Sequence, residues 1–291
     1  MEIWVNRYEV LTDPQAKHFL ENGYVIIEDC LDRSLAAEWT RRAFARLGYD
    51  PANPDTWEEE IVWMDRESIV PVKEISPKAW GAICDVIGGE DRIEEETKRI
   101  EGNHFTTINS SEWSDAFVVN FKRGADKGWF PPSPRVDGWH KDGSFFRHFL
   151  DSPEQALLTI VLWSDVEHQG GGTYIAPDSV RVIAHYLSEH PEGISGGVFS
   201  SLIDRCRVFE ELTGPIGTFI ILHPFMLHAS SNNILGKPRF MTNPPILLRE
   251  PMNLNRYRNK GFSLLERTTL QALGVDRFDF RPTSPRRSDW L

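Results

Sequence analysis

The spacing of apolar residues changes about one third of the way along the chain. Before residue 105 the apolar positions recur at helical spacing, and after it short β-rich runs alternate with turns rich in glycine and proline. Thr12 followed by Gln15 is a capping box, and Asp32 is a second N-cap. The pattern predicts helices over 13–22, 33–47 and 78–87, with a strand over 24–27.

Two segments between these elements lack clear apolar spacing. Residues 48–72 are rich in proline and charge and are expected to be mostly loop, with a short helix near Trp57. Residues 91–102 carry dense charge and are expected to be solvated.

The second part of the chain predicts a β core. The expected strands are 117–122, 156–163, 173–176, 217–223 and 239–248, with 156–163 as the central one. Many short strands after a run of helices favour a mainly β fold with flanking helices: a double-stranded β-helix (jelly roll, cupin-like) core with a helical N-terminal region. We expect one domain over 1–291, divided into a helical support (1–104), the β-helix core (105–250) with an insert (180–212), and a C-terminal helix and tail (251–291).

A His-x-Asp pair stands between glycines in the middle of the chain. If the segment from His140 to Asp142 is extended, both side chains project from the same face, because side chains alternate along a strand. An imidazole beside a carboxylate supplies two of the three ligands of a facial ferrous site. Alone the signal is weak, because such pairs are common by chance.

A third ligand and an anion site are available downstream. His223 and His228 share one apolar run, and Arg239 follows His228 by eleven residues. A hairpin of that length would place His228 and Arg239 on neighbouring strands facing one interior. There the guanidinium would offer a bidentate fork to a carboxylate. Pairing of Arg239 with an internal acidic residue explains the spacing equally well.

Composition and net charge limit the classes of partner that we expect the chain to bind. The chain of 291 residues has a net charge of −11, which argues against a general grip on DNA or RNA and against docking on anionic membranes. Its three cysteines, Cys30, Cys84 and Cys206, lie far apart, so neither a disulfide framework nor a zinc ribbon is indicated. We therefore expect a reduced, cytoplasmic setting, with no signal peptide and no membrane span.

Taken jointly, the motifs resemble a known family. His140-x-Asp142, His228-Ala229-Ser230 and Arg239 are similar to the pattern of the phytanoyl-CoA dioxygenase family of Fe(II)/2-oxoglutarate-dependent oxygenases. The opening helix and strand and the segment 171–177 also resemble that family, so the likeness covers about residues 11–250. Asp178-Ser179-Val180 departs from it, because the family usually has a Gly-Ser-His-like signature there.

The resemblance implies the cofactors Fe(II) and 2-oxoglutarate. The iron ligands that it implies are His140, Asp142 and His228, with His223 as the competing third ligand. Arg239 would hold the distal carboxylate of 2-oxoglutarate, and Ser230 would donate a second hydrogen bond. Asn120 or Lys122 would contact the near carboxylate.

The resemblance also implies the reaction. Molecular oxygen and 2-oxoglutarate would oxidise a C–H bond of a small organic molecule, most simply by hydroxylation, with release of succinate and CO2. Related halogenases have a small residue in place of the carboxylate ligand, so Asp142 favours hydroxylation, desaturation or ring formation. Trp139 and Phe145 flank the ligands and are the candidate substrate-lining residues, although aromatic residues of a jelly roll are more often core.

Two other classes of protein compete with this hypothesis. A cupin-like metalloenzyme without a co-substrate would not need Arg239. A non-catalytic binding barrel would be expected to have lost a metal ligand, whereas all three candidates are present. A nucleic-acid demethylase is disfavoured by the acidic charge balance.

Overall fold

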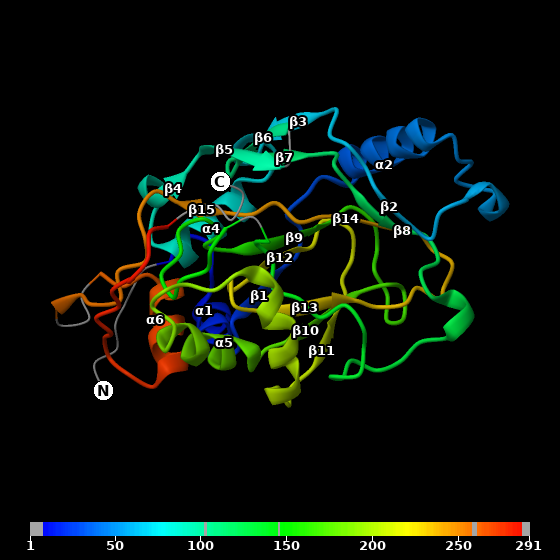
Figure 1. The fold of residues 1–291 in the computed structure, drawn as a ribbon. Helices are drawn as coiled ribbons and strands as arrows, with labels where there is room; N and C mark the ends of the chain where they lie inside the picture. The colour runs from blue at the N-terminus through cyan, green and yellow to red at the C-terminus, as the bar shows by residue number, and fades with distance from the viewer. Residues whose placement is uncertain (1–7, 102–103, 145, 258–260, 287–291) are drawn as a thin grey trace.

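Two antiparallel sheets form the centre of the molecule (Figure 1). The computed structural model describes residues 8–101, 104–144, 146–257 and 261–286. The larger sheet contains, in spatial order, β1 (Tyr24–Ile27), β12 (Phe219–Leu222), β9 (Leu158–Leu162), β14 (Arg239–Thr242), β8 (Val118–Asn120) and β2 (Ile61–Trp63). The smaller sheet contains β11 (Glu210–Leu212), β10 (Thr173–Ala176) and β13 (Leu227–Ser230).

The chain passes back and forth between these sheets. After β9 in the larger sheet come β10 and β11 in the smaller, β12 in the larger, β13 in the smaller and β14 in the larger. Residues of both sheets line one cavity, so the sheets face each other. The predicted jelly-roll core is therefore confirmed, with β9 inside the larger sheet as expected.

The expected strand 239–248 is in fact two strands. β14 ends at Thr242, and β15 (Leu247–Leu248) pairs with β4 (Ile93–Glu94) in a separate small sheet. Pro244 and Pro245 lie between them and have no N–H to give to a ladder.

Strands occur in both of the segments that lack clear apolar spacing. Residues 48–72 include η1 (Pro54–Thr56) as the short helix near Trp57, but also β2 and β3 (Ile69–Pro71), which pairs with β7 (Glu112–Ser114). The charged segment 91–102 includes β4 and β5 (Glu96–Glu101), and β5 pairs with β6 (His104–Asn109). β2 and β3 are apolar but only three residues long, and β5 and β6 consist mostly of polar residues, so apolar spacing did not reveal these strands.

The expected N-terminal helices are present. They are α1 (Asp13–Asn22), α2 (Arg33–Leu47) and α4 (Pro77–Ile87). Two short helices, α3 (Val72–Ile75) and η2 (Glu90–Arg92), lie on either side of α4 and were not expected. Thr12 and Gln15 form the predicted capping box, and the Asp32 carboxylate accepts hydrogen bonds from the first turn of α2. On α2 the Trp39 ring stacks on Trp163, with centroids 4.7 Å apart. These contacts bury α2 against the larger sheet.

Further helices occur after residue 120. They are η3 (Ala125–Lys127), α5 (Ser179–Ser188), η4 (Gly196–Arg205) and α6 (Leu264–Leu273). α1, α5 and α6 lie together at lower left in Figure 1. The end of the predicted insert 180–212 is β11, which belongs to the smaller sheet. No helix among the described residues is both long and apolar enough to cross a bilayer.

Candidate metal centre

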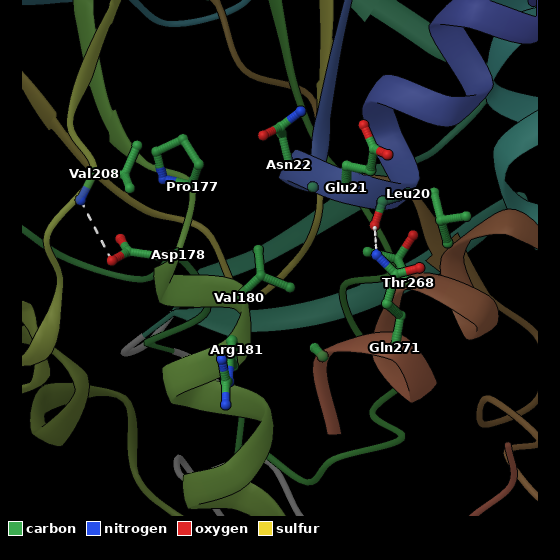
Figure 2. Close-up of a pocket in the computed structure, with 12 residues that line it drawn as sticks. Leu20, Glu21, Asn22, Pro177, Asp178, Val180, Arg181, Val208, Thr268 and Gln271 are labelled. Atoms are coloured by element: carbon green, nitrogen blue, oxygen red, sulfur yellow. Dashed lines mark hydrogen bonds between the residues drawn. The ribbon is translucent and has the colours of Figure 1, made fainter. Parts of the chain in front are cut away.

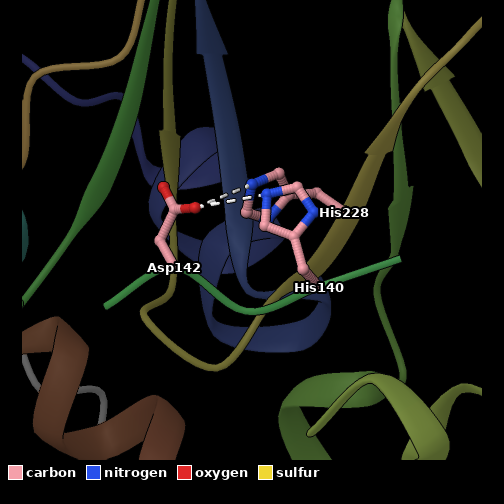
Figure 3. A group of neighbouring side chains, drawn as sticks. All are labelled: His140, Asp142 and His228. Carbon is pink, nitrogen blue, oxygen red and sulfur yellow. Dashed lines mark ion pairs between the residues drawn. The ribbon is translucent and has the colours of Figure 1, made fainter. Parts of the chain in front are cut away.

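Three side chains from two distant segments of the chain converge between the sheets (Figure 3). One Asp142 carboxylate oxygen, Oδ1, lies 3.3 Å from His140 Nε2 and 3.4 Å from His228 Nε2. One potential ligand atom from each residue lies within 4.8 Å of the other two. Two imidazole nitrogens and a carboxylate oxygen at this separation can bind one divalent metal ion.

The backbone brings the two histidines opposite each other. His140 and His228 form an antiparallel pair in which each N–H donates to the other's carbonyl at 3.0 Å. This pairing adds the His-x-Asp segment to the free edge of β13. Asp142, two residues on, then reaches the same side as His140, as the sequence predicted.

Each histidine is oriented by a carbonyl two residues upstream. His140 Nδ1 lies 2.7 Å from the Gly138 oxygen, and His228 Nδ1 lies 3.2 Å from the Met226 oxygen. A carbonyl can only accept, so it fixes the tautomer with the proton on Nδ1. The lone pair of each Nε2 is then directed at the shared centre, which is how metal-binding histidines are commonly prepared.

Asp142 is held ionised by its neighbours. Burial raises the pKa of its carboxyl, but in the metal-free protein His228 and His140, when they carry a proton on Nε2, outweigh burial and hold that pKa well below its usual range; a metal ion bound by the lone pairs of both Nε2 atoms would supply positive charge in place of those protons. The centre therefore presents a carboxylate.

Behind the metal ligands lies a buried polar network that the sequence did not indicate. Lys141 is only 6% exposed, and its ammonium lies 2.7 Å from His148 Nδ1 and donates to the Asp142 carbonyl at 3.2 Å. Burial lowers the pKa of Lys141 to about 7. His148 in turn lies 2.7 Å from the Gly143 carbonyl through Nε2, so it belongs to this network and not to a pocket wall. The one available signal was alternation, which directs Lys141 away from its two neighbours.

His223, the competing third ligand, lies elsewhere. It is fully buried, with Nε2 3.0 Å from the Thr269 hydroxyl on α6 and Nδ1 accepting the Phe225 N–H. Burial lowers its pKa to about 3, so it is neutral. Both ring nitrogens are used, and within the described residues the metal-binding group contains His228 instead.

Arg239 is a buried cation without a carboxylate partner among the residues that the structure describes. Its side chain is 1% exposed, and one terminal nitrogen, Nη1, donates to the Gly171 carbonyl at 2.8 Å. Nε and Nη2 are buried with no hydrogen-bond partner among the described residues. Burial, and then the charge of Arg123, lower the pKa of Arg239 to about 10, so it stays charged at neutral pH. The alternative of an internal acidic partner is therefore wrong for the described chain.

The route by which Arg239 reaches the interior differs from the prediction. β13 and β14 are not neighbouring strands of a hairpin, because β14 lies between β9 and β8 in the larger sheet. Arg239 instead faces His228 from the opposite sheet. Arg239 is paired with Asn120 on the neighbouring strand β8. Met241, two residues after Arg239, lines the cavity at the metal centre. Alternation therefore places Arg239 on the same inward face.

That cavity, here called the metal cavity, has a volume of about 220 Å³. His140, His228 and Ser230 line one side. Its apolar walls come mostly from the larger sheet and are Ile61, Trp63, Val118, Leu158, Ile160 and Met241.

The other expected 2-oxoglutarate contacts differ in position. Ser230 shares the inward face of β13 with His228 and lines the metal cavity. Asn120 is buried, with its side-chain oxygen accepting the Arg123 N–H and its amide donating to the Ser231 carbonyl. A Cβ on Gly171 would lie 2.8 Å from that amide, so glycine permits this close approach. Lys122 is exposed and donates to the Trp57 carbonyl, so the structure does not bring it to the centre.

Of the two expected substrate-lining residues, Trp139 lines neither the metal cavity nor any other cavity described here. Trp139 is 5% exposed, packs on Phe209 and donates from its indole nitrogen to the Ser133 carbonyl. It points away from its neighbour His140, as alternation requires. Phe145 lies outside the described residues.

Trp63 and Arg123 were missed and do line the metal cavity. Arg123 and Ser230 also line a second, larger hollow of about 600 Å³, here called the outer cavity. The two cavities therefore meet at these residues. The one signal for Trp63 was the apolar triplet Ile61-Val62-Trp63, which consists of residues favoured in strands, within an apparent loop.

A third hollow is remote from the metal centre (Figure 2). It has a volume of about 270 Å³ and lies between α1, α5 and α6, where Gln271 donates to the Leu20 carbonyl. Arg181 on α5 lines it, and no residue of the metal centre does.

Comparison with known proteins gives distant similarities. No model of a known protein family matches the chain. L-Proline trans-4-hydroxylase of Streptomyces griseoviridis is 25% identical over 141 residues, which are 42% of this chain and 50% of that protein. The chain thus spans about half the length of this curated relative.

Three solved structures show the range of similarity in fold. The α-ketoglutarate-dependent carbocyclase SnoK from nogalamycin biosynthesis gives a TM-score of 0.49 at 13% identity, covering 88% of this chain and 94% of SnoK. EctD from S. alaskensis, with 2-oxoglutarate and 5-hydroxyectoine, gives 0.43 at 18% identity, covering 84% and 79%. HygX from Streptomyces hygroscopicus, with nickel and 2-oxoglutarate, gives 0.42 at 15% identity, covering 81% and 87%. At this distance the fold assignment depends on the strand topology described above.

Proposed function

We propose that the chain is an Fe(II)/2-oxoglutarate-dependent oxygenase that oxidises a C–H bond of a small organic molecule, most simply by hydroxylation. In that reaction one atom of molecular oxygen enters the product and the other enters succinate, while 2-oxoglutarate loses CO2. The order of the motifs favours the phytanoyl-CoA dioxygenase-like branch. The distant relative named as a proline hydroxylase favours the same chemistry.

The donor set fits ferrous iron. Two neutral imidazoles and one carboxylate are the facial set that leaves positions open for other ligands. His140, Asp142 and His228 would hold the metal, which supplies the redox chemistry when bound. The carbonyls of Gly138 and Met226 keep both imidazoles in the binding tautomer.

The observation that supports 2-oxoglutarate as the co-substrate is that two buried nitrogens of Arg239 have no hydrogen-bond partner among the described residues. A buried guanidinium with two unpartnered nitrogens costs free energy, which a carboxylate can offset by two charge-assisted hydrogen bonds. Arg239 faces the space between the sheets from the side opposite the metal ligands. A dicarboxylate bound at one end by the metal would meet Arg239 at its other end.

Other residues of the metal cavity complete this arrangement. Ser230 forms no side-chain hydrogen bond with the described residues and can donate its hydroxyl to the same carboxylate. Leu158, Ile160 and Met241 give the cavity apolar walls that exclude water from the reacting atoms. The Asn120 side chain already forms hydrogen bonds with backbone groups of Arg123 and Ser231. We therefore propose that the metal alone binds the near carboxylate of 2-oxoglutarate.

A reducing, cytosolic setting fits this proposal. All three cysteines are free, and ferrous iron is stable only where oxidation is held back.

The experiment is anaerobic addition of Fe(II) and 2-oxoglutarate to the metal-free protein. A weak visible charge-transfer band is expected, and it should be lost in Asp142→Ala and His228→Ala. His185→Ala is the matched control, because His185 is an exposed histidine on α5 away from the centre. Its band should match that of the unchanged protein.

The other outcomes are equally informative. Iron binding without the band would replace the proposal by a metalloenzyme that uses no 2-oxoglutarate. Failure to bind iron would indicate a non-catalytic binding barrel.

A further inference from the structure

The substrate of the proposed oxygenase should enter through the outer cavity. That cavity joins the metal cavity at Arg123 and Ser230, and its volume of about 600 Å³ is within the range of small-molecule sites. Its rim is fixed in place, since the Tyr174 hydroxyl donates to the Phe130 carbonyl and Asn232 donates to the Gly128 carbonyl. The space is therefore preformed.

Arg123 lies where the two cavities meet, and its charge is not paired with a carboxylate of the described residues. No described residue forms a hydrogen bond or an ion pair with its side chain, which is half-buried. A Cβ built on Gly138 would lie 3.8 Å from Arg123 Nη2, which places the guanidinium beside the segment that carries His140. After burial, the charge of Arg123 is the next cause of the lowered pKa of Arg239. Two cations thus face the same space.

The carboxylates of 2-oxoglutarate do not account for both cations. One carboxylate is assigned to Arg239 and the other to the metal, so Arg123 still lacks an anion. The outer cavity strengthens this excess, because Lys127 and Arg135 line it together with Glu60 and Asp137. Three cations against two carboxylates is a local positive balance in a chain of net charge −11. Such a site attracts a small anion.

Exposed aromatic rings lie on both sides of Arg123. Trp63 in the metal cavity is 69% exposed, and Phe130 in the outer cavity is 57% exposed. Large apolar side chains left open beside a concave site mark a surface that a ligand covers.

We infer that the substrate is a small molecule with a carboxylate, which pairs with Arg123 while its apolar body packs against Trp63. Arg123 is then the residue that determines specificity, and the oxidised carbon lies only a few bonds from the carboxylate, because Arg123 and His140 line the same cavity. This inference rests on the proposed function.

The test is a panel of proteinogenic amino acids and short aliphatic and aromatic monocarboxylates, each paired with its primary amide. Succinate release with Fe(II), 2-oxoglutarate and oxygen is measured for the unchanged protein, Arg123→Gln and Arg123→Lys. Arg181→Gln is the matched control, because it removes the same charge at the remote cavity in Figure 2. Binding is also read without turnover, from the tryptophan fluorescence of the metal-free protein, with Trp63→Phe as reference.

The expected result is stimulation by acids and not by their amides. Loss of one charge-assisted pair in Arg123→Gln should raise the KM for the acid about tenfold to a hundredfold. The KM for 2-oxoglutarate should stay unchanged, Arg123→Lys should recover part of the loss, and Arg181→Gln should behave as the unchanged protein.

Three results would overturn the inference: amides that work as well as acids, no response to any acid, or an Arg123→Gln variant that loses affinity for 2-oxoglutarate instead. If the charge-transfer band fails to form in the unchanged protein, the proposed function fails. The fluorescence titration still decides whether Arg123 binds a carboxylate.

Discussion

Replacing Arg239 by methionine separates a binding residue from a structural one. The variant keeps the apolar stem and removes the guanidinium, which has one hydrogen bond, to the Gly171 carbonyl, and two unpartnered nitrogens. Losing the partner of that carbonyl costs about 1–3 kcal/mol, and removing two buried unpaired donors gains about as much for each. The free energy of unfolding of the metal-free protein should therefore rise by about 1–3 kcal/mol, because two gains outweigh one loss of the same size. An arginine paired with an internal carboxylate would cost about 3–5 kcal/mol instead.

The effect on 2-oxoglutarate should be much larger. Two charge-assisted hydrogen bonds contribute at least about 3 kcal/mol, or more than a hundredfold in affinity. At a concentration about a hundredfold above the Kd, 2-oxoglutarate should stabilise the unchanged iron-loaded protein by about 2.7 kcal/mol. At the same concentration the Arg239→Met variant should gain no more than about 0.4 kcal/mol.

The assay is anaerobic urea unfolding with and without 2-oxoglutarate. Arg181→Met controls for loss of an arginine, because Arg181 is exposed on α5. A variant that unfolds several kcal/mol more easily, yet is stabilised by 2-oxoglutarate as much as the unchanged protein, would refute the assignment of Arg239.

Three further changes test the surroundings of the site. Lys141→Met should weaken Fe(II) binding about tenfold to a hundredfold in a metal titration, because Lys141 fixes the segment between two ligands. Glu266→Gln should lower the free energy of unfolding at neutral pH by about 3 kcal/mol, because it breaks a buried pair with Arg92. Burial alone raises the pKa of Glu266, but Arg92 lowers it below the usual 4.5, so this stability is present above that pH and is lost as the pH falls through the lowered value. Urea unfolding across that range should give a flatter profile for the variant. Trp39→Ala should cost about 3–5 kcal/mol through loss of its stack on Trp163, with the charge-transfer band unchanged.

The sequence predicted what depends on neighbouring residues. Thr12 and Asp32 indicate where their helices begin, because an N-cap side chain forms hydrogen bonds only within the first turn of its own helix. His140 and Asp142 could be placed side by side because alternation is a property of any extended segment. The same alternation directs the side chain of Trp139, between Gly138 and His140, away from the metal centre, which is where the structure places it.

The sequence did not predict which sheet a strand joins. The eleven residues from His228 to Arg239 limit the reach of the chain, but they do not distinguish a hairpin from a crossing between sheets. The orphaned state of Arg239 is also a tertiary property, since it depends on every group packed around it. Trp63 was missed because its strand is only three residues long and gains its regularity from pairing with β8.

The division of the centre between two sheets has a mechanical consequence. The proposed metal ligands belong to the smaller sheet and the segment paired with it, whereas Arg239 belongs to the larger sheet. A co-substrate held at both ends would join the two halves of the barrel and resist their sliding past each other. Succinate is one carbon shorter and cannot span the same gap in the same way. Release of the product and loosening of the barrel would then be a single event, and amide hydrogen exchange in β13 and β14 would report it.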